Sequence, residues 1–195
     1  MKDMLKLGLV LALYAMAACV GLAFVYNGTQ TIIADRQQAD LEASLKELFK
    51  DGEVFEPAPA GYGTSANPAL VFNSTYLVSR AGTVIGMAIS ASISSYGGQL
   101  TALVGIGTDN KITRVKILSH SDTPGLGAQA ASASYFVDKS TKTTFTGQFA
   151  GKSVRDPFEV KNDIIAITAS TITSRAVSTL VKECAAQAHE YFAGQ

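Results

Sequence analysis

The sequence predicts an α+β fold, in which a single apolar N-terminal helix precedes a domain with an antiparallel sheet and packing helices. Three observations lead to this prediction. An uncharged apolar run opens the chain, strand-like segments joined by turn residues follow between Thr83 and His120, and apolar residues recur at helical spacing near the C-terminus. With 195 residues, 47% of them hydrophobic, the chain is long enough for one globular domain besides the apolar run.

The uncharged run extends from Leu7 to Tyr26, about 20 residues, which is the length that one helix needs to cross the core of a bilayer. Lys2 and Lys6 precede it, and the next basic residue is Arg36. Because basic residues tend to stay on the cytoplasmic side, we expect a cytoplasmic N-terminus and an extracytoplasmic remainder. Residues 1–28 are therefore assigned to a cytoplasmic tip and a transmembrane anchor in the cell membrane.

Two other interpretations of this run are a cleaved signal peptide and a lipoprotein anchored at Cys19, which follows the sequence MAA. The run is long for a signal peptide and continues past the small residues. After Cys19 the chain stays apolar, with the sequence VGLAFVY, where a mature lipoprotein normally becomes polar. An uncleaved anchor is favoured. The other cysteine, Cys184, lies in the outer domain, so we expect no disulfide.

A stalk helix is predicted over residues 29–51, because Leu41, Leu45 and Leu48 recur at spacings of four and three among charged residues. The following stretch, DGEVFEPAPAGYGTSANP, is rich in Gly and Pro and is typical of a connecting loop. Residues 52–195 are assigned to the outer domain.

Within this domain the segments TVIGMAISAS, QLTALVGIGT and KITRVKILSH have the composition of strands. The sequences YGGQ and TDNK between them favour turns, so an antiparallel meander is predicted. Further along, FTGQFAGKSVRDPFEV is turn-rich and is typical of a hairpin.

Composition excludes several classes of function. The net charge is zero and no basic stripe is interleaved with aromatic residues, so nucleic acid is not an expected partner. The chain has no CxxC pair, and His120 and His189 belong to different predicted elements, so no metal site is expected. A nicotinamide fingerprint such as GxGxxG and a catalytic acid–base pair are also absent from the sequence.

The last predicted strand runs into the sequence HSDTPGLGAQ. Pro124 fixes its own φ angle, while Gly125 and Gly127 permit tight turns or the close approach of a ligand. These residues alone fit both a stiff surface loop and a binding loop.

The final helix is predicted to begin between Ser170 and Thr173 and to bury one apolar face. That face comprises Val177, Leu180, Val181, Cys184, Ala188 and Phe192. Hydroxyl residues crowd its start, and Arg175 lies in its first turns. A helix N-terminus offers free N–H groups and the positive end of the helix dipole, so these groups fit a phosphate as well as they fit an ordinary Ser/Thr cap.

Two motifs resemble those of a known family. TASTITS, residues 168–174, resembles the motif Ser/Thr-Gly-Ala-Thr-x-Thr-Ser of proteins that carry FMN covalently through its phosphate. HSDTPGLG, residues 120–127, resembles the family signature His-x-Glu-Thr-Pro-Gly-Leu-Gly, and SYGGQL resembles a third, weaker one. The order of the motifs also matches. The short length and single anchor resemble the G subunit of the Rnf ferredoxin:NAD oxidoreductase more than the C subunit of the sodium-pumping NADH:quinone reductase.

The resemblance implies that Thr171 carries FMN through a phosphoester. It implies a phosphate cradle made by Thr168, Ala169, Ser170 and Thr173. It further implies a flavin-facing loop of Asp122, Thr123, Pro124, Gly125, Leu126 and Gly127. No base is fixed beside Thr171 in the sequence pattern, and in this family a separate flavin transferase attaches the cofactor. We expect no catalytic side chains, because the redox chemistry belongs to the flavin.

Four positions depart from the family pattern. Gly-Ala of the motif is Ala169-Ser170 here, so Ser170 offers a second hydroxyl. An acid often found six residues before the modified threonine is replaced by Ile165, with Asp163 the nearest acid. The loop acid is Asp122 instead of glutamate.

Three classes of function follow. The first is an electron-carrying subunit of a redox-driven ion pump, working with membrane and iron–sulfur subunits and incomplete as an enzyme by itself. The second is a stand-alone membrane-anchored FMN-binding reductase, which the lack of a nicotinamide site disfavours. The third is a non-catalytic extracytoplasmic module.

Overall fold

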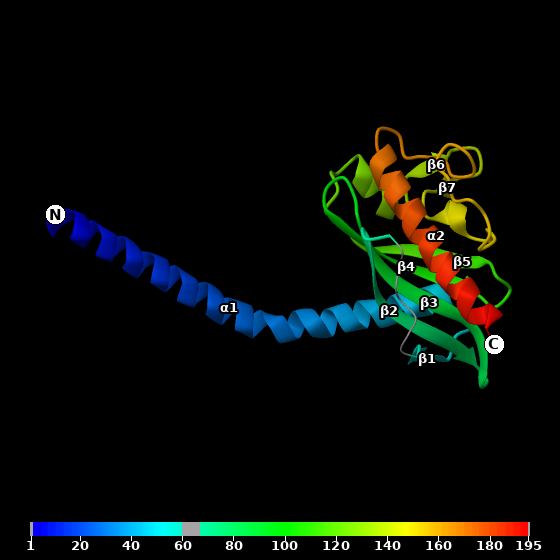
Figure 1. Ribbon diagram of the computed structural model, residues 1–195, viewed down its shortest axis with the longest axis horizontal. Helices are drawn as coiled ribbons and strands as arrows, with labels where there is room; N and C mark the ends of the chain where they lie inside the picture. The colour runs from blue at the N-terminus through cyan, green and yellow to red at the C-terminus, as the bar shows by residue number, and fades with distance from the viewer. Residues whose placement is uncertain (1, 60–66, 195) are drawn as a thin grey trace. The chain divides into compact units, whose positions relative to one another are not determined.

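The structure is a computed structural model that describes residues 2–59 and 67–194 (Figure 1). It contains a long helix, a five-stranded sheet, a two-stranded ribbon, two short 3-10 helices and a C-terminal helix. The elements are α1 (Lys2–Leu48), β1 (Val54–Pro57), β2 (Leu70–Arg80), β3 (Thr83–Ser94), β4 (Gln99–Gly107), β5 (Ile112–Ser119), η1 (Gly127–Ala131), β6 (Phe136–Asp138), β7 (Thr143–Thr144), η2 (Gly147–Phe149) and α2 (Thr171–Ala193). The predicted α+β class is confirmed.

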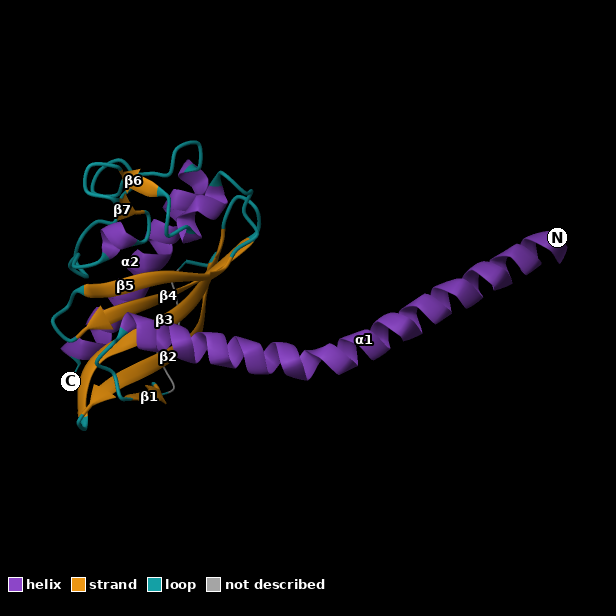
Figure 2. Cartoon of the chain, turned by 180° about the vertical axis from the view of Figure 1, so that it is seen from behind, coloured by secondary structure: helices purple, strands orange, loops and turns teal. Residues whose placement is uncertain are grey.

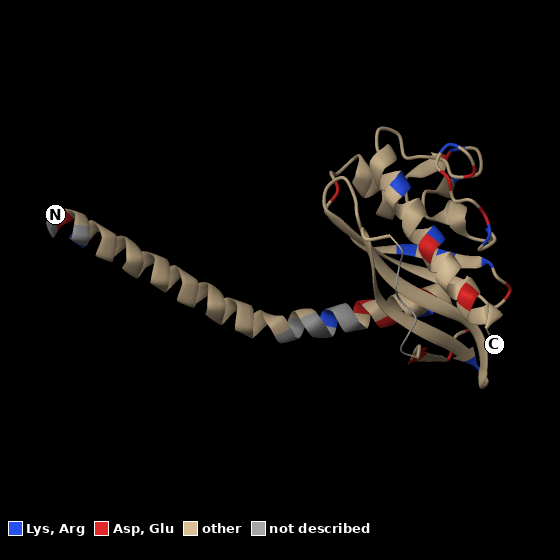
Figure 3. Ribbon diagram, in the orientation of Figure 1, with Lys and Arg blue, Asp and Glu red and all other residues tan. Residues whose placement is uncertain are grey.

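The chain divides into two compact units, Met1–Ala43 and Ser44–Gln195. The first consists of most of α1. Its segment Lys6–Gln30 is long and apolar enough to cross a membrane by length and composition. Figure 3 shows that α1 carries no acidic or basic side chain along this part after Lys6. The anchor and stalk predicted separately are one uninterrupted helix, while the boundaries 1–28, 29–51 and 52–195 stay predictions.

The second unit is built on an antiparallel sheet in the order β1-β2-β3-β4-β5. The meander predicted between Thr83 and His120 is confirmed as β3, β4 and β5. The sequence analysis missed β2, whose alternation is broken by bulges at Phe72/Ser74 and Val78/Ser79.

The prediction of one continuous loop after the stalk is wrong at residues 54–57, which form the edge strand β1. Pro57 is tolerated there because an edge strand has one side without a ladder partner. The rest of that predicted loop includes residues 60–66, which lie outside the described residues.

Helix α2 covers one face of the sheet (Figures 1 and 2). The last residues of α1, from Ser44 to Leu48, belong to the same unit, and Leu48 lies against Gly105 of β4. The core under α2 joins inward residues of β3 and β4 to the helix, among them Ile89, Val104 and Leu180. The apolar face predicted for α2 is confirmed, with Phe192 only partly buried. Cys184 lies in this core, where burial raises the pKa of its thiol and makes it unreactive.

On the opposite face Phe49 sits against two glycines of the sheet. A Cβ atom added to Gly86 would lie 2.5 Å from Cε1 of Phe49 and 2.6 Å from the carbonyl oxygen of Ile106, and one added to Gly105 would lie 3.0 Å from Cε2 of Phe49. Beside this contact Glu47 pairs with Arg114 and Lys116 on β5, and the hydrogen bond from Lys116 holds the pKa of Glu47 below its usual value.

We therefore expect Gly86→Ala to lower the free energy of unfolding by about 1–3 kcal/mol, because the added methyl group collides with backbone and with Phe49. Gly107 is its partner in the β3–β4 register and provides the control. There an added Cβ meets chiefly the movable carboxylate of Asp109, so Gly107→Ala should cost less. Urea denaturation of the detergent-solubilised chain measures both, and equal losses would contradict the role given to Phe49.

The hairpin predicted for residues 145–160 is wrong. This stretch contains η2 and a series of turns, and it buries Phe145, Phe149 and Phe158 in the main core. The rings of Phe145 and Phe149 meet edge to face with centroids 5.7 Å apart, and Phe158 stacks 6.3 Å from Phe149. The spacing of these aromatic residues serves core packing and not strand alternation, which is why the turn residues alone were misleading.

Candidate functional site

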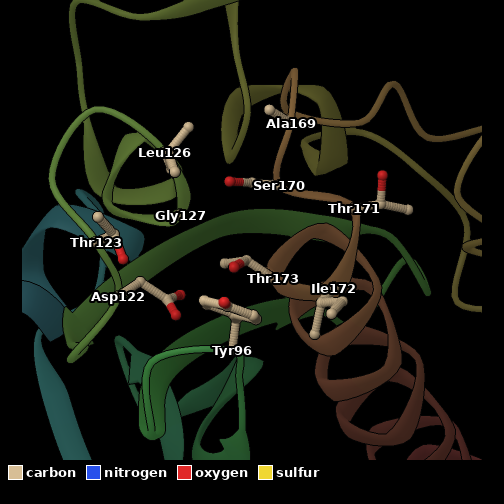
Figure 4. Close-up of a pocket in the computed structure, with 10 residues that line it drawn as sticks. All are labelled: Tyr96, Asp122, Thr123, Leu126, Gly127, Ala169, Ser170, Thr171, Ile172 and Thr173. Carbon is tan, nitrogen blue, oxygen red and sulfur yellow. The ribbon is translucent and has the colours of Figure 1, made fainter.

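A pocket of about 400 Å³ lies where the N-terminus of α2 meets the β3–β4 turn and the loop after β5 (Figure 4). All three segments were singled out in the sequence, and the fold brings them together from positions that are up to 77 residues apart, between Tyr96 and Thr173. The lining residues are Tyr96, Asp122, Thr123, Leu126, Gly127, Ala169, Ser170, Thr171, Ile172 and Thr173.

Most of the residues expected to hold a cofactor line this pocket, but Thr168, Pro124 and Gly125 do not. Tyr96 and Ile172 line it and were not expected. The motif SYGGQL contains Tyr96 and could have indicated it, whereas Ile172 occupies the unspecified position of the hydroxyl motif. The proximity of these residues supports a common site, and the binding role of each stays a prediction.

Helix α2 begins at Thr171, within the predicted range, with Ser170 in the N-cap position. The expected hydroxyl cap is wrong for Ser170, which makes no side-chain cap hydrogen bond because its backbone has φ −134° and ψ 48°. Figure 4 shows its hydroxyl directed toward the loop that holds Leu126 and Gly127. The first N–H groups of α2 therefore have no cap from Ser170 and have no acceptor within the helix.

The side chain of Ser174, and not that of Ser170, orders the start of α2. Its buried Oγ accepts a hydrogen bond from the N–H of Ile167 at 3.0 Å and donates one to the carbonyl of Ser170 at 2.9 Å. In addition, the N–H of Thr168 donates to the hydroxyl of Tyr135 at 3.4 Å. These contacts fix the turn before Thr171, and they explain structurally why a serine closes the hydroxyl motif.

Ala169 has a φ angle of +60°, in the left-handed region that an alanine side chain disfavours. The family pattern places glycine at this position, and the backbone geometry supplies the reason. With alanine at this position the turn carries backbone strain.

Ala169→Gly should therefore stabilise the chain by about 0.5–1 kcal/mol, since relief of the left-handed strain exceeds the added freedom of the unfolded chain. Ala150 is the control: it is also exposed, but its φ is −61°. Ala150→Gly should destabilise the chain. Thermal unfolding of both variants checks this, and a loss of stability in both would be inconsistent with strain at Ala169.

The wall opposite α2 is a tight junction of loops. The carboxylate of Asp122 is buried and accepts hydrogen bonds from Oγ of Ser95 at 2.7 Å and from the N–H of Gly97 at 2.6 Å. A Cβ atom added to Gly127 would lie 2.6 Å from Oγ1 of Thr173 and 2.7 Å from Cβ of Asp122. The glycine is thus needed for contact between the loop and the helix, whereas the sequence alone had fitted either a tight turn or the close approach of a ligand.

The rim of the pocket is apolar and exposed. Tyr96 is 70% exposed, Ile172 57% and Leu126 41%. In contrast, the lining residues Ser170 and Thr173 are buried hydroxyl residues at the start of α2, where the first N–H groups of the helix are free. A flavin nucleotide has the same division, with an anionic phosphate at one end and a flat aromatic ring at the other, so the groups present fit FMN.

Arg175 and Asp163, both considered in the sequence analysis, do not line the pocket. Asp163 forms an ion pair with Lys152 at 3.1 Å and accepts a hydrogen bond from the N–H of Glu159. Although burial by itself raises the pKa of Asp163, these two partners bring it below its usual value. The backbone of Ile165 is held on both sides by the side-chain amide of Gln148. Across the residues that the structure describes, no cluster of metal-ligating side chains occurs.

Comparison with known proteins agrees with the position of the pocket. A family model described as an FMN-binding domain matches residues 95–186, which include every residue that lines the pocket. A second model, the RnfG N-terminal region, matches residues 1–48.

Curated relatives match most of the chain. It is 30% identical over 180 residues to the G subunit of the proton-translocating ferredoxin:NAD(+) oxidoreductase complex of Clostridium ljungdahlii, covering 89% of this chain and 85% of the relative. It is 32% identical over 195 residues to the G subunit of the ion-translocating oxidoreductase complex of Aliivibrio fischeri, covering 93% and 89%. The chain therefore belongs to the family of G subunits of the Rnf-type, ion-translocating ferredoxin:NAD oxidoreductase complexes.

Proposed function

We propose that this chain is a membrane-anchored flavoprotein subunit that carries electrons through FMN bonded covalently to Thr171, within an ion-translocating ferredoxin:NAD oxidoreductase complex. The membership in the G-subunit family and the match to an FMN-binding domain support this function. The observation that carries the assignment of the site is the pocket at the start of α2, which joins both motifs around Thr171.

The geometry favours Thr171 over Ser170 as the attachment residue. Thr171 is the first residue of α2 and is partly exposed, and Figure 4 shows its hydroxyl directed away from Ser170 and Thr173. Ser170 is buried, with its hydroxyl toward the facing loop. An external enzyme can thus reach Oγ1 of Thr171 more readily. A phosphate attached there lies beside the free N–H groups of the helix, whose dipole favours an anion.

Each part of the pocket then has a role toward the bound FMN. The free N–H groups at the start of α2 hold the phosphate end, and Ser170 and Thr173 line the pocket beside it. The apolar rim of Tyr96, Leu126 and Ile172 contacts the ring and limits its exposure to water. The flavin supplies the one- and two-electron redox chemistry, and the protein orients it and adjusts its potential through packing and hydrogen bonds.

Attachment needs a separate flavin transferase. Among the described residues, none of the groups lining the pocket is a base placed to activate Thr171, because the one carboxylate, Asp122, is bonded to Ser95 and Gly97. A threonine hydroxyl is a poor nucleophile without such a base.

The proposed partners are the membrane and iron–sulfur subunits of the complex. A tagged full-length chain, extracted from its native membrane in mild detergent, should co-purify with iron–sulfur proteins and with NADH- or ferredoxin-linked activity. Purification of a flavin-loaded chain that oxidises a donor without other subunits would instead support a stand-alone reductase.

We also propose that the N-terminus is cytoplasmic and that the FMN domain lies outside the cytoplasm, because Lys2 and Lys6 precede the uncharged run from Leu7 to Tyr26, within the segment Lys6–Gln30 that is apolar enough to cross a membrane. Protease added to cells stripped of their outer layers should digest the part of the chain after this segment. Protection of that part until the cytoplasm is opened would reverse the proposed orientation.

A further inference from the structure

The turn that carries Tyr96 is held at both ends by one carboxylate. Oδ2 of Asp122 accepts a hydrogen bond from Ser95, and Oδ1 accepts one from the backbone of Gly97. Both bonds are charge-assisted, and Asp122 is only 6% exposed, so water competes weakly for it. The residues immediately before and after Tyr96 are therefore fixed by a side chain from a different loop.

Tyr96 has no comparable support from packing. Its side chain is 70% exposed at the pocket mouth, so its position depends on the backbone that carries it. That backbone is also in close contact with the Asp122 loop, since a Cβ atom added to Gly97 would lie 2.3 Å from the carbonyl oxygen of Ser121. Figure 4 shows Tyr96 and Asp122 on the same side of the pocket.

Asp122 also lies close to the start of α2, which forms another wall of the pocket. Its Cβ and Cγ are both 2.7 Å from the place where a Gly127 side chain would begin, and Oγ1 of Thr173 on α2 is 2.6 Å from the same place. One buried carboxylate thus stands at the junction of the β3–β4 turn, the loop after β5 and the start of α2.

We infer that Asp122 is a positioning residue. Its two hydrogen bonds, from Ser95 and from Gly97, form a bracket around Tyr96 that orders the pocket mouth, and Asp122 acts on a bound flavin through that tyrosine. The inference rests on the proposed flavin function. It differs from the expectation that Asp122 touches the flavin itself, because both carboxylate oxygens already accept hydrogen bonds from Ser95 and Gly97. A direct role would depend on the negative charge, whereas a bracket depends on the two hydrogen bonds.

Two substitutions separate the bracket from the charge. Asp122→Asn removes the charge but preserves the bracket, since the amide oxygen accepts from Gly97 and the amide N–H donates to the Ser95 hydroxyl. Ser95→Ala breaks one of the two bonds and keeps the charge. Ser94→Ala is the matched control, because Ser94 is an exposed serine next in sequence.

The full-length variants are made together with a flavin transferase and purified in detergent. Intact mass gives the covalent FMN content of each. Flavin fluorescence and its quenching by iodide then report how the ring is covered, and a redox titration gives its midpoint potential. Contact with a tyrosine ring both quenches flavin fluorescence and shields the ring from iodide.

With equal FMN content, Ser95→Ala should raise fluorescence and iodide quenching by roughly twofold or more, because one charge-assisted bond is lost. Asp122→Asn should change these readouts and the potential less than Ser95→Ala does, and Ser94→Ala should match the wild type. In a Tyr96→Ala background, Ser95→Ala should add no further change.

A larger effect of Asp122→Asn than of Ser95→Ala, or an effect of Ser95→Ala that persists without Tyr96, would overturn the inference and leave the flavin function intact. Absence of FMN from the wild-type chain would overturn the proposed function and the inference with it.

Discussion

Thr171→Ala is expected to abolish covalent flavin completely, because it removes the oxygen on which the proposed phosphoester would form. A phosphoester survives denaturation, whereas a flavin held by stacking and hydrogen bonds does not. The wild-type chain, produced with a flavin transferase, should therefore fluoresce in a denaturing gel and the variant should not. Thr171 is the first residue of α2 and is only partly buried, so the free energy of unfolding should change by less than about 1 kcal/mol.

Neighbouring hydroxyls provide the controls. Thr171→Ser keeps a hydroxyl at the same place and should retain part of the label. Ser170→Ala and Thr173→Ala should retain the label, since these residues line the pocket beside the phosphate. Fluorescence that persists in Thr171→Ala and disappears in Ser170→Ala would move the attachment to Ser170 and leave the family assignment unaffected.

Gly127→Val is expected to have the second largest effect. Gly127 is buried between Thr173 of α2 and Asp122 of its own loop. A Cβ atom added to it would lie within 3 Å of both side chains. The loop and α2 must separate to admit the valine, which should cost about 3 kcal/mol of unfolding free energy and widen the pocket. The variant should therefore lose stability and also bind the flavin ring less well, with higher fluorescence per bound FMN.

Gly125→Ala is the matched comparison within the same loop. Gly125 has a φ of +78°, but no atom lies within 4 Å of an added Cβ. The substitution should cost only about 1–2 kcal/mol of backbone strain and leave flavin fluorescence unchanged. Denaturation and fluorescence measurements on both variants decide the matter, and equal fluorescence in Gly127→Val and Gly125→Ala would show that Gly127 does not shape the pocket.

The two motifs of the candidate site could be recognised in the sequence because each is a short, local run of residues. Hydroxyl residues at a helix start and a Pro-Gly loop are visible without a fold, and the structure places both around one pocket. Tyr96 was missed because the motif SYGGQL, although recognised in the sequence, does not show by itself that the β3–β4 turn reaches the same pocket. That information lies in the hydrogen bonds from Ser95 and Gly97 to Asp122, which join residues more than twenty positions apart.

The same contrast holds for the fold. The meander β3–β5 has regular strands and short turns, so its pattern was recognisable in the sequence. The strand β2 was not, because its bulges shift the register, and residues 145–160 resembled a hairpin although Phe149 and Phe158 are committed to the core. Ser170 looked like a helix cap, but the turn that Ser174 and the left-handed Ala169 create gives its backbone another conformation. Bulges, core packing and the turn before α2 thus decide these structures, and the local composition does not reveal them.

The central claim is tested most directly by fragment mass spectrometry of the wild-type chain purified from its own membrane. The account predicts a chain heavier than its sequence by one FMN less water, with the added mass on Thr171. An unmodified Thr171 in a chain that retains its native partners would contradict the claim, and so would the same added mass on any other residue.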